Sequence, residues 1–306
     1  MIGYVVRRVL QMIPVLFGIT LVVFVLLRAS GDPVSLMLGE EASEAQIAQL
    51  REAYGLDRPL YEQYAVYMGD LLTGDFGRSI RYNNQPALEV VLERLPATAS
   101  LAAMALVYAI LISLPAGIIA ALYRRRIPDQ IASFLSVLGQ AMPNFWLGIM
   151  LILVFAIWFG WFPVSGREDA YAVVLPGLAL GASLAAVLTR LLRSSMIEVL
   201  SQDYIRTARA KGIGPTAVML RHAIRNALLS YLTVIGLEAS SLMAGAVVTE
   251  QVFAWPGIGL LAIQAINSRD MAVVQTIVIL AALIVMLVNL LVDVLYSLID
   301  PRIQHV

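Results

Sequence analysis

The sequence predicts an all-α, polytopic membrane protein with six transmembrane helices. Hydrophobic residues make up 60% of the 306-residue chain and charged residues only 14%, whereas an average soluble domain is about 25% charged. A soluble core cannot bury this much apolar surface, so a bilayer must solvate most of it. Six apolar stretches are long enough to cross about 30 Å of hydrocarbon at about 1.5 Å per residue. They are residues 9–27, 98–122, 134–162, 172–192, 230–253 and 272–298.

Two of these stretches need separate treatment. The first follows Arg7 and Arg8 and resembles a signal peptide. Its apolar run is longer than the usual 7–15 residues, roughly, of a cleaved signal, so we expect an uncleaved first span. The third is interrupted by Pro143 and Asn144. Because proline removes a backbone donor, we expect a kinked or interfacial inner end there.

Positive charges predict the orientation of the spans. If six spans alternate, the arginine-rich stretches share one side, which the positive-inside rule makes cytoplasmic, with both termini. Those stretches are residues 7–8, 124–126 and 193–229, and Arg302. Three tryptophans then fall at the outer ends of spans, at the level of an aromatic belt. They are Trp158, Trp161 and Trp255.

The segment between the first two spans, residues 28–96, is then an extracytoplasmic cap, and we assign residues 1–97 to an N-terminal span plus cap. Ser43 to Gln46 form a capping box opening one helix. Pro59 starts another, with Leu60, Tyr64, Tyr67 and Leu71 on one face. The cap either covers the first span or offers a docking surface to a soluble partner.

The chain lacks the parts of several enzyme classes. It has no cysteine and two histidines, His222 and His305, so we expect no metal site. Its only lysine, Lys211, precedes Gly212 rather than Ser or Thr, so it has no nucleotide-binding P-loop. We therefore expect no catalytic residue and no cofactor in this chain. A membrane-embedded enzyme is the alternative from another class, and a structural or signalling protein that senses through the cap is a third.

The segment from Asp203 to Leu229 predicts two short helices separated by a sharp turn. Asp203 is the expected N-cap of a helix over Tyr204–Lys211. Gly212 is expected to end that helix in the left-handed conformation. Gly214 and Pro215 then start the second helix.

This segment is suited to binding another molecule. Ala208, Ala210 and Gly212 would let a partner's backbone approach closely, and arginines offer paired hydrogen bonds to carboxylates. Anionic lipid headgroups and an ordinary cytoplasmic linker are the competing interpretations. DNA binding is improbable for a segment tied to spans at both ends, so we expect no nucleic-acid partner. The basic residues are Arg206, Arg209, Lys211, Arg221 and Arg225.

The stretch Asp203–Gly212, DYIRTARAKG, resembles the cytoplasmic coupling motif of permeases in bacterial ABC importers of the dipeptide, oligopeptide, glutathione and nickel class. The general EAA…G form of the motif matches only at Ala208 and Gly212, and the peptide-class form matches better. The resemblance covers the whole chain through a series of shorter motifs in matching order. They are GDP at 31–33, YGLDRPL at 54–60, GDFGRS at 74–79, LPGLALG at 175–181, FAWPGIG at 253–259, NLLVD at 289–293 and DPR at 300–302.

The resemblance implies a type I ABC importer permease with a MetI-like bundle, over residues 98–306, and a coupling segment at about 201–229. It implies a heterodimer with a second homologous permease and one or two ATP-binding subunits, which hold the ATP and Mg. An extracytoplasmic substrate-binding protein would deliver cargo, and the bacterial inner membrane would hold the complex among its lipids. Peptides are the expected cargo, with nickel or another small solute as the alternative. The residues expected to couple to the ATPase are Asp203, Tyr204, Arg206, Thr207, Ala208, Arg209, Ala210, Lys211 and Gly212.

Three polar residues are candidates for the translocation pathway. Glu238 lies about 12 Å into the fifth span, where a carboxylate is costly unless it faces a cavity or a partner. It lines the pathway or, equally, holds helices together. Gln140 and Asn144 flank the Pro143 break and reach a cavity or cap freed backbone groups. Glu250, at the outer end of the fifth span, is a candidate contact for the binding protein.

Four further residues are assigned to helix packing. Gly177 and Gly181 form a small-xxx-small face in the fourth span, which favours close approach of another helix. Asn289 and Asp293 are four residues apart in the sixth span, so they share one face. Polar groups on packed spans often bridge helices, so we favour a structural role for this pair.

Overall fold

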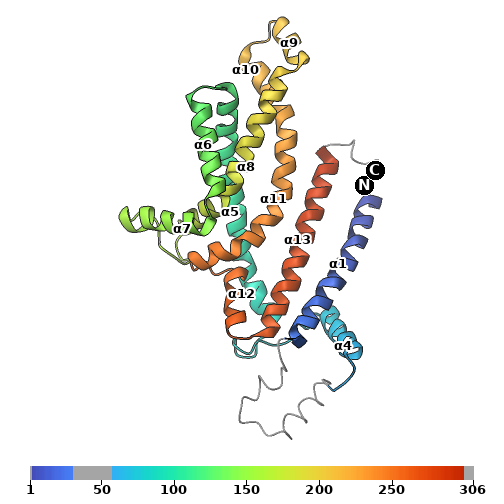
Figure 1. Ribbon diagram of the computed structural model, residues 1–306. Helices are drawn as coiled ribbons and strands as arrows, with labels where there is room; N and C mark the ends of the chain where they lie inside the picture. Colours follow the sequence, from blue (N-terminus) through green and yellow to red (C-terminus); the bar gives the residue numbers. More distant parts are fainter. Residues whose placement is uncertain (1, 30–56, 300–306) are drawn as a thin grey trace. The chain divides into compact units, whose positions relative to one another are not determined.

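The computed structural model describes residues 2–29 and 57–299, and this part of the chain is almost entirely helical (Figure 1). Its one β-type contact is an isolated bridge between Arg78 and Pro86. The described residues form two compact units. The first contains residues 2–29, 57–93 and 262–290, and the second contains residues 94–261 and 291–299. The predicted capping box at Ser43–Gln46 lies outside the described residues.

In the first unit, the cap helix α4 (Leu60–Thr73) packs on α1 (Ile2–Ala29) through aromatic side chains. The ring of Tyr64 lies 5.6 Å from that of Phe17 and 5.4 Å from that of Phe24, centroid to centroid. The Tyr64 hydroxyl also lies 2.9 Å from Thr20 Oγ1, and Tyr67 contacts Phe24 at 5.7 Å. The cap therefore covers part of the first span.

The predicted start of α4 is confirmed. Pro59 is its N-cap, and Gly74 ends it in the left-handed conformation, with φ of 84°. Leu60 was expected on the packed face, but it is 63% exposed. It belongs to the first turn, beyond the part of α4 that reaches α1.

The loop after α4 is hydrogen-bonded to the turn that precedes α13 (Met271–Ile299) and to the first turns of α13 itself. Asp270, which is fully buried, accepts a hydrogen bond from the Ser79 hydroxyl and another, of 3.2 Å, from the Arg81 backbone nitrogen. Gln275 Nε2 donates to the Phe76 carbonyl at 2.8 Å. These contacts give the GDFGRS stretch a structural role, since it supplies Phe76 and Ser79.

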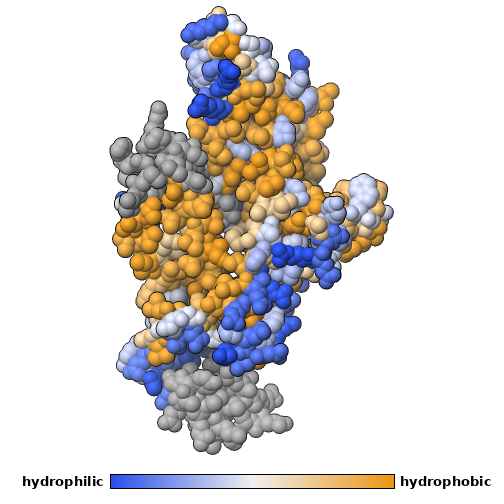
Figure 2. All heavy atoms as spheres, turned by 180° about the vertical axis from the view of Figure 1, so that it is seen from behind, coloured by the Kyte–Doolittle hydropathy of each residue, from blue (hydrophilic) through white to orange (hydrophobic). Residues whose placement is uncertain are grey.

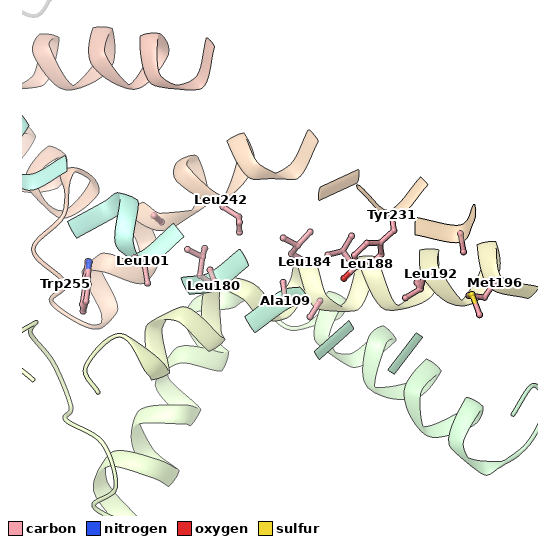
Figure 3. Close-up of a cluster of buried hydrophobic side chains, with 14 of the residues drawn as sticks. Leu101, Ala109, Leu180, Leu184, Leu188, Leu192, Met196, Tyr231, Leu242 and Trp255 are labelled. Carbon is pink, nitrogen blue, oxygen red and sulfur yellow. The ribbon is translucent and has the colours of Figure 1, made fainter. Parts of the chain in front are cut away.

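The second unit is a bundle built around α8 (Val174–Ser201). It also contains most of α5 (Ala87–Leu122), together with α6 (Ile127–Ala141) and α11 (Arg225–Val252). Figure 3 shows large side chains of α8 along the bundle's core. The outer surface is apolar, and Figure 2 shows it as a broad orange area below the polar α9 end. The core residues of α8 are Leu180, Leu184, Leu188, Leu192 and Met196, none more than 4% exposed.

Within residues 2–29 and 57–299, four helices are long and apolar enough to cross a membrane, and two bent pairs raise this to as many as six crossings. The predicted third span is not one straight helix. Its chain turns by 107° after α6 and continues as α7 (Asn144–Leu151) and a π-helical stretch, η1 (Ile152–Trp158). Pro143, in an extended conformation, stands at the break, because its ring cannot follow a helical turn and it lacks an N–H.

Candidate coupling segment and buried interhelical contacts

The predicted coupling helix is present as α9 (Asp203–Ala210), one residue after the end of α8. The prediction that Asp203 is the N-cap of α9 is wrong. Gln202 takes that position, because its backbone is extended and its carbonyl already accepts from the backbone nitrogen of Ile205 at 3.1 Å. Asp203 instead lies in the first turn of α9, where its negative charge interacts favourably with the positive end of the helix dipole. Its Oδ1 accepts a hydrogen bond from the Arg206 guanidinium at 3.1 Å.

The C-terminus of α9 is a Schellman motif. Gly212 has φ of +79°, and its nitrogen donates to the Arg209 carbonyl at 3.0 Å. The Ile213 nitrogen donates to the Ala208 carbonyl at 3.2 Å. These two bonds satisfy carbonyls that a helix end leaves free, and they require the left-handed residue that the sequence predicted. Lys211 is the C-cap rather than the last helical residue.

One face of α9 is buried in a small apolar cluster. Ile205 is fully buried and Ala208 is 7% exposed, and both pack with Val218 and the half-buried Ile213. Ala208 was expected to face a partner. This expectation is wrong, because the Schellman turn folds Ile213 and Val218 back over that side of the helix. The cluster therefore fixes the orientation of α9.

The opposite face of α9 is exposed and polar. Asp203, Arg206, Thr207 and Ala210 are spaced so that they share this face. The pair between Asp203 and Arg206 is itself exposed, at 92% and 75%. Such a pair contributes well under about 1 kcal/mol, so both side chains remain available to other partners. Figure 2 shows the polar surface gathered at this end of the bundle.

The predicted second helix begins at Pro215, as expected, and joins α11 without a break. Its parts are α10 (Pro215–Ala217), a π-helical stretch η2 (Val218–Ile224) and then α11. Asn226, in the first turn of α11, donates from Nδ2 to the Tyr204 hydroxyl at 2.9 Å. α9 thus contacts both α8, through Gln202, and α11.

An ion pair that was not predicted, between a buried aspartate and a half-buried arginine, connects α6 with α8. Arg193 donates from Nε to Asp129 Oδ1 at 2.5 Å and from a terminal nitrogen to Oδ2 at 2.9 Å. Asp129 is 4% exposed. The sequence offers only a carboxylate in the first turn of a helix, which is common at such positions. Its partner, 64 residues away, is set by the packing.

Glu250 was considered a contact for a soluble partner, but it is fully buried. Its Oε1 accepts from the Thr98 hydroxyl at 2.6 Å, and its Oε2 accepts from the Leu260 nitrogen at 2.9 Å. Thr98 Oγ1 in turn accepts from the Ile258 nitrogen at 2.9 Å. Glu250 therefore joins α11, α5 and the start of α12 (Ile258–Asn267) rather than facing outward.

The FAWPGIG stretch provides the space for that carboxylate. A Cβ on Gly257 would overlap the Glu250 carboxylate, and one on Gly259 would lie 2.6 Å from the Val247 backbone. Trp255 was expected in an aromatic belt, but it is 2% exposed, and its indole nitrogen donates to the Ala97 carbonyl at 2.8 Å. The other two tryptophans of that prediction, Trp158 and Trp161, are 75% and 62% exposed.

The two glycines of α8 lie against α5. A Cβ on Gly177 would come within 2.9 Å of the Tyr108 ring, and one on Gly181 would overlap the carbonyl oxygen of Ala105. Close approach of the two backbones explains why no larger residue fits there.

The remaining candidates lie at separate places. Glu238 is half-buried on α11, Gln140 is exposed at the end of α6, and Asn144 is half-buried at the start of α7. On α13, Asn289 is exposed and Asp293 is half-buried. Their pathway and packing roles stay predictions.

Curated relatives match the whole chain. It is 42% identical to "Dipeptide transport system permease protein DppB" of Alkalihalophilus pseudofirmus, with complete coverage of both chains. It is 40% identical to "Oligopeptide transport system permease protein AppB" of Bacillus subtilis and 41% identical to "Glutathione transport system permease protein GsiC" of Escherichia coli, again over all of both chains.

Solved structures show the same fold at lower identity. The methionine ABC transporter MetNI in an inward-facing conformation matches with a TM-score of 0.60 at 17% identity, over 71% of this chain and 99% of that one. An amino acid ABC transporter matches with a TM-score of 0.53 at 19% identity, over 70% and 94%.

Two family descriptions account for nearly all of the sequence. Residues 1–102 match the N-terminal component of binding-protein-dependent transport system membrane proteins, and residues 113–305 match the inner membrane component itself. The apolar helices agree with a multi-pass membrane protein. The chain belongs to the family of binding-protein-dependent transport system inner membrane components, and it is a transport permease.

Proposed function

We propose that this permease forms half of the translocation pathway of an ATP-driven peptide importer and that α9 is the element on which an ATP-binding subunit acts. The observation that carries the proposal is the two-sided character of α9. One side is anchored by Ile205 and Ala208, and the other presents Asp203, Arg206 and Ala210 to solvent. An element that must transmit a push needs both an exposed contact face and a rigid attachment.

The contacts of α9 with the bundle determine which helices a displacement of α9 moves. α9 is separated from α8 only by Gln202, and its Tyr204 hydroxyl contacts Asn226 at the start of α11. A displacement of α9 therefore acts on two helices of the bundle together. Those helices pack along the core that Figure 3 shows, so their relative positions are restricted by close contact.

Small peptides are the proposed cargo. The relatives described above carry names that refer to dipeptides, oligopeptides and glutathione, and each spans the full chain. These three cargoes share a peptide backbone, an amino group and a carboxylate. Glu238 is the proposed contact for the amino group, because a carboxylate in a span is costly unless it faces a cavity or a partner.

The proposed complex contains a second homologous permease, one or two ATP-binding subunits and an extracytoplasmic binding protein. ATP hydrolysis is assigned to the ATP-binding subunits, since this chain lacks a P-loop. Both termini and α9 are placed on the cytoplasmic side of the inner membrane, which the arginine-rich stretches support.

The test uses the complex reconstituted in lipid discs. Ala210→Trp places a bulky side chain on the exposed face of α9, and Ala65→Trp makes the same change at an exposed alanine of α4. We expect Ala210→Trp to lower ATP turnover and co-purification of the ATP-binding subunits about tenfold, equal to about 1.4 kcal/mol of docking free energy. Ala65→Trp should leave both unchanged. Normal turnover with Ala210→Trp would exclude α9 as the contact.

Cargo is tested separately, by uptake of radiolabelled dialanine and glutathione into proteoliposomes that contain the complete complex. Glu238→Gln should reduce uptake of the accepted peptide while the subunits still co-purify. Unchanged uptake would remove Glu238 from the pathway, and uptake of neither peptide would contradict the proposed cargo class.

A further inference from the structure

The Asp129 carboxylate has a complete set of partners inside the bundle. Besides the two bonds from Arg193, its Oδ2 accepts from the Arg125 backbone nitrogen at 2.8 Å, and its Oδ1 lies 3.4 Å from the Ser133 hydroxyl. Two parallel bonds from one guanidinium fix both the distance and the orientation of the groups they join. The Asp129–Arg193 pair joins two different helices, whereas the pair between Asp203 and Arg206 lies within α9.

At Gly139 the contact between α6 and α8 is different in kind. A Cβ on Gly139 of α6 would lie 3.5 Å from the Cβ of Ala186 on α8 and 3.6 Å from the Ala182 carbonyl, which is ordinary van der Waals contact. Contacts between small apolar groups are non-directional, so they resist separation but allow one helix to slide or rotate against the other. The ion pair is what can prevent such sliding.

The position of the pair connects it to the coupling helix. Arg193 lies eight residues before the end of α8, about 12 Å along the helix, and α9 follows after Gln202. Asp129 lies at the start of α6, whose other end leads to the break at Pro143 and to α7. A rotation of α8 at this end reaches α6 through the ion pair.

We propose that Asp129 and Arg193 are positioning residues for transport: their ion pair makes α6 move together with α8 when the coupling helix is displaced. The proposal rests on the proposed role of α9, because it concerns where that displacement is passed on. Neither residue touches cargo or nucleotide in this account. Loss of the pair therefore uncouples transport from ATP turnover rather than abolishing turnover.

The first test removes both charges together. Asp129→Asn with Arg193→Met keeps an acceptor for the Arg125 nitrogen and replaces the arginine by an unbranched apolar side chain that matches its aliphatic stem. A double replacement avoids leaving one charge buried and unpaired, so the bundle should still fold. In the complete complex we expect dialanine imported per ATP hydrolysed to fall about tenfold, while ATP turnover changes less than about twofold.

The second test restores the connection between α6 and α8 by a disulfide in place of the ion pair. The 306 residues contain no cysteine, so Gly139→Cys and Ala186→Cys introduce the only thiols of this chain. Their Cβ separation lies within the range of about 3.5–4.5 Å that a disulfide needs. In the uncharged double variant, oxidation should restore import per ATP, and a reductant should remove it again. Each single cysteine variant serves as the control. A purely structural role predicts no reversible recovery.

A third readout does not depend on cargo. With the native ion pair, the disulfide should form at the same rate in the nucleotide-free and vanadate-trapped complexes, because α6 and α8 keep their contact. Without the pair, the two rates should differ. The proposal is overturned if the disulfide blocks import when the native pair is present, if oxidation restores nothing, or if the rates differ with the pair intact. Failure of the coupling role itself would show instead as normal turnover with Ala210→Trp.

Discussion

Replacing Glu250 by alanine should destabilise the bundle by about 2–6 kcal/mol. Glu250 is fully buried and accepts from the Thr98 hydroxyl and the Leu260 nitrogen. Its removal leaves the buried Thr98 hydroxyl and the partly buried Leu260 nitrogen without their acceptor, and each such group costs about 1–3 kcal/mol. Glu250→Gln keeps one carbonyl acceptor in the same volume. It should therefore cost about half as much, since one of the two bonds survives.

A double-mutant cycle with Thr98→Val isolates the shared bond. Thr98→Val should cost about 2–6 kcal/mol as well, because it leaves the Ile258 nitrogen and Glu250 Oε1 unpaired. The double variant should be more stable than the sum of the two single losses by about 1–3 kcal/mol, because both remove the same bond. Unfolding in mixed micelles, followed by the fluorescence of the four tryptophans, measures these differences.

The result that refutes this reasoning is a Glu250→Ala variant within about 0.5 kcal/mol of the original chain, the range typical of surface substitutions away from structural features. If Glu250 contacted the binding protein instead, Glu250→Gln would weaken binding of that protein and leave the unfolding transition unchanged. The two measurements on one variant therefore separate the buried role from the docking role.

Three further predictions concern backbone geometry and the outer loop. Gly181→Ala should destabilise the bundle by about 1–3 kcal/mol in the same unfolding assay, because the new Cβ overlaps a carbonyl of α5. The control Gly139→Ala should be neutral or stabilising by up to about 1 kcal/mol. Equal stabilities of the two variants would contradict the close approach of α8 to α5. Gly212→Ala should cost about 1 kcal/mol of local stability through its positive φ, seen as faster amide exchange in α9, and unaltered exchange would contradict the Schellman end. Asp270→Ala should free the loop of residues 74–86 to proteolysis, because it removes the acceptor of the Ser79 hydroxyl, and an unchanged cleavage rate would show that the other contacts suffice.

Local features were predictable where they depend on residues close in the sequence. Gly212 ends α9 because only a residue tolerant of positive φ fits the Schellman turn, and Pro143 stands at the break of the third span, where it lacks an N–H and favours the extended backbone of Met142 before it. Pro215 starts a helix for a related reason, since its fixed φ suits a first turn, and Pro59 stands one residue before its helix, as the N-cap of α4. Each of these signals acts within about one helical turn.

Most of the wrong expectations have a different cause. Asp203, Ala208, Trp255 and Glu250 were each assigned from their own chemistry and their depth in a span. For three of them the outcome depended on a contact beyond a single helical turn: Val218 of the next helix packs on Ala208, and two segments remote in the chain supply the Ala97 carbonyl that binds Trp255 and the Thr98 hydroxyl that binds Glu250. The predicted N-cap at Asp203 is wrong by one residue, a displacement that is common at helix ends.

Composition and short motifs were thus sufficient to identify a polytopic helical membrane protein and the two-helix segment at residues 203–229, since hydropathy and backbone preference are properties of neighbouring residues. The direction in which each polar side chain points required the packed bundle. Asp129 meets Arg193, and Glu250 meets Thr98, only because helices remote in the chain lie against one another, and no local pattern records which distant donor will face a given carboxylate.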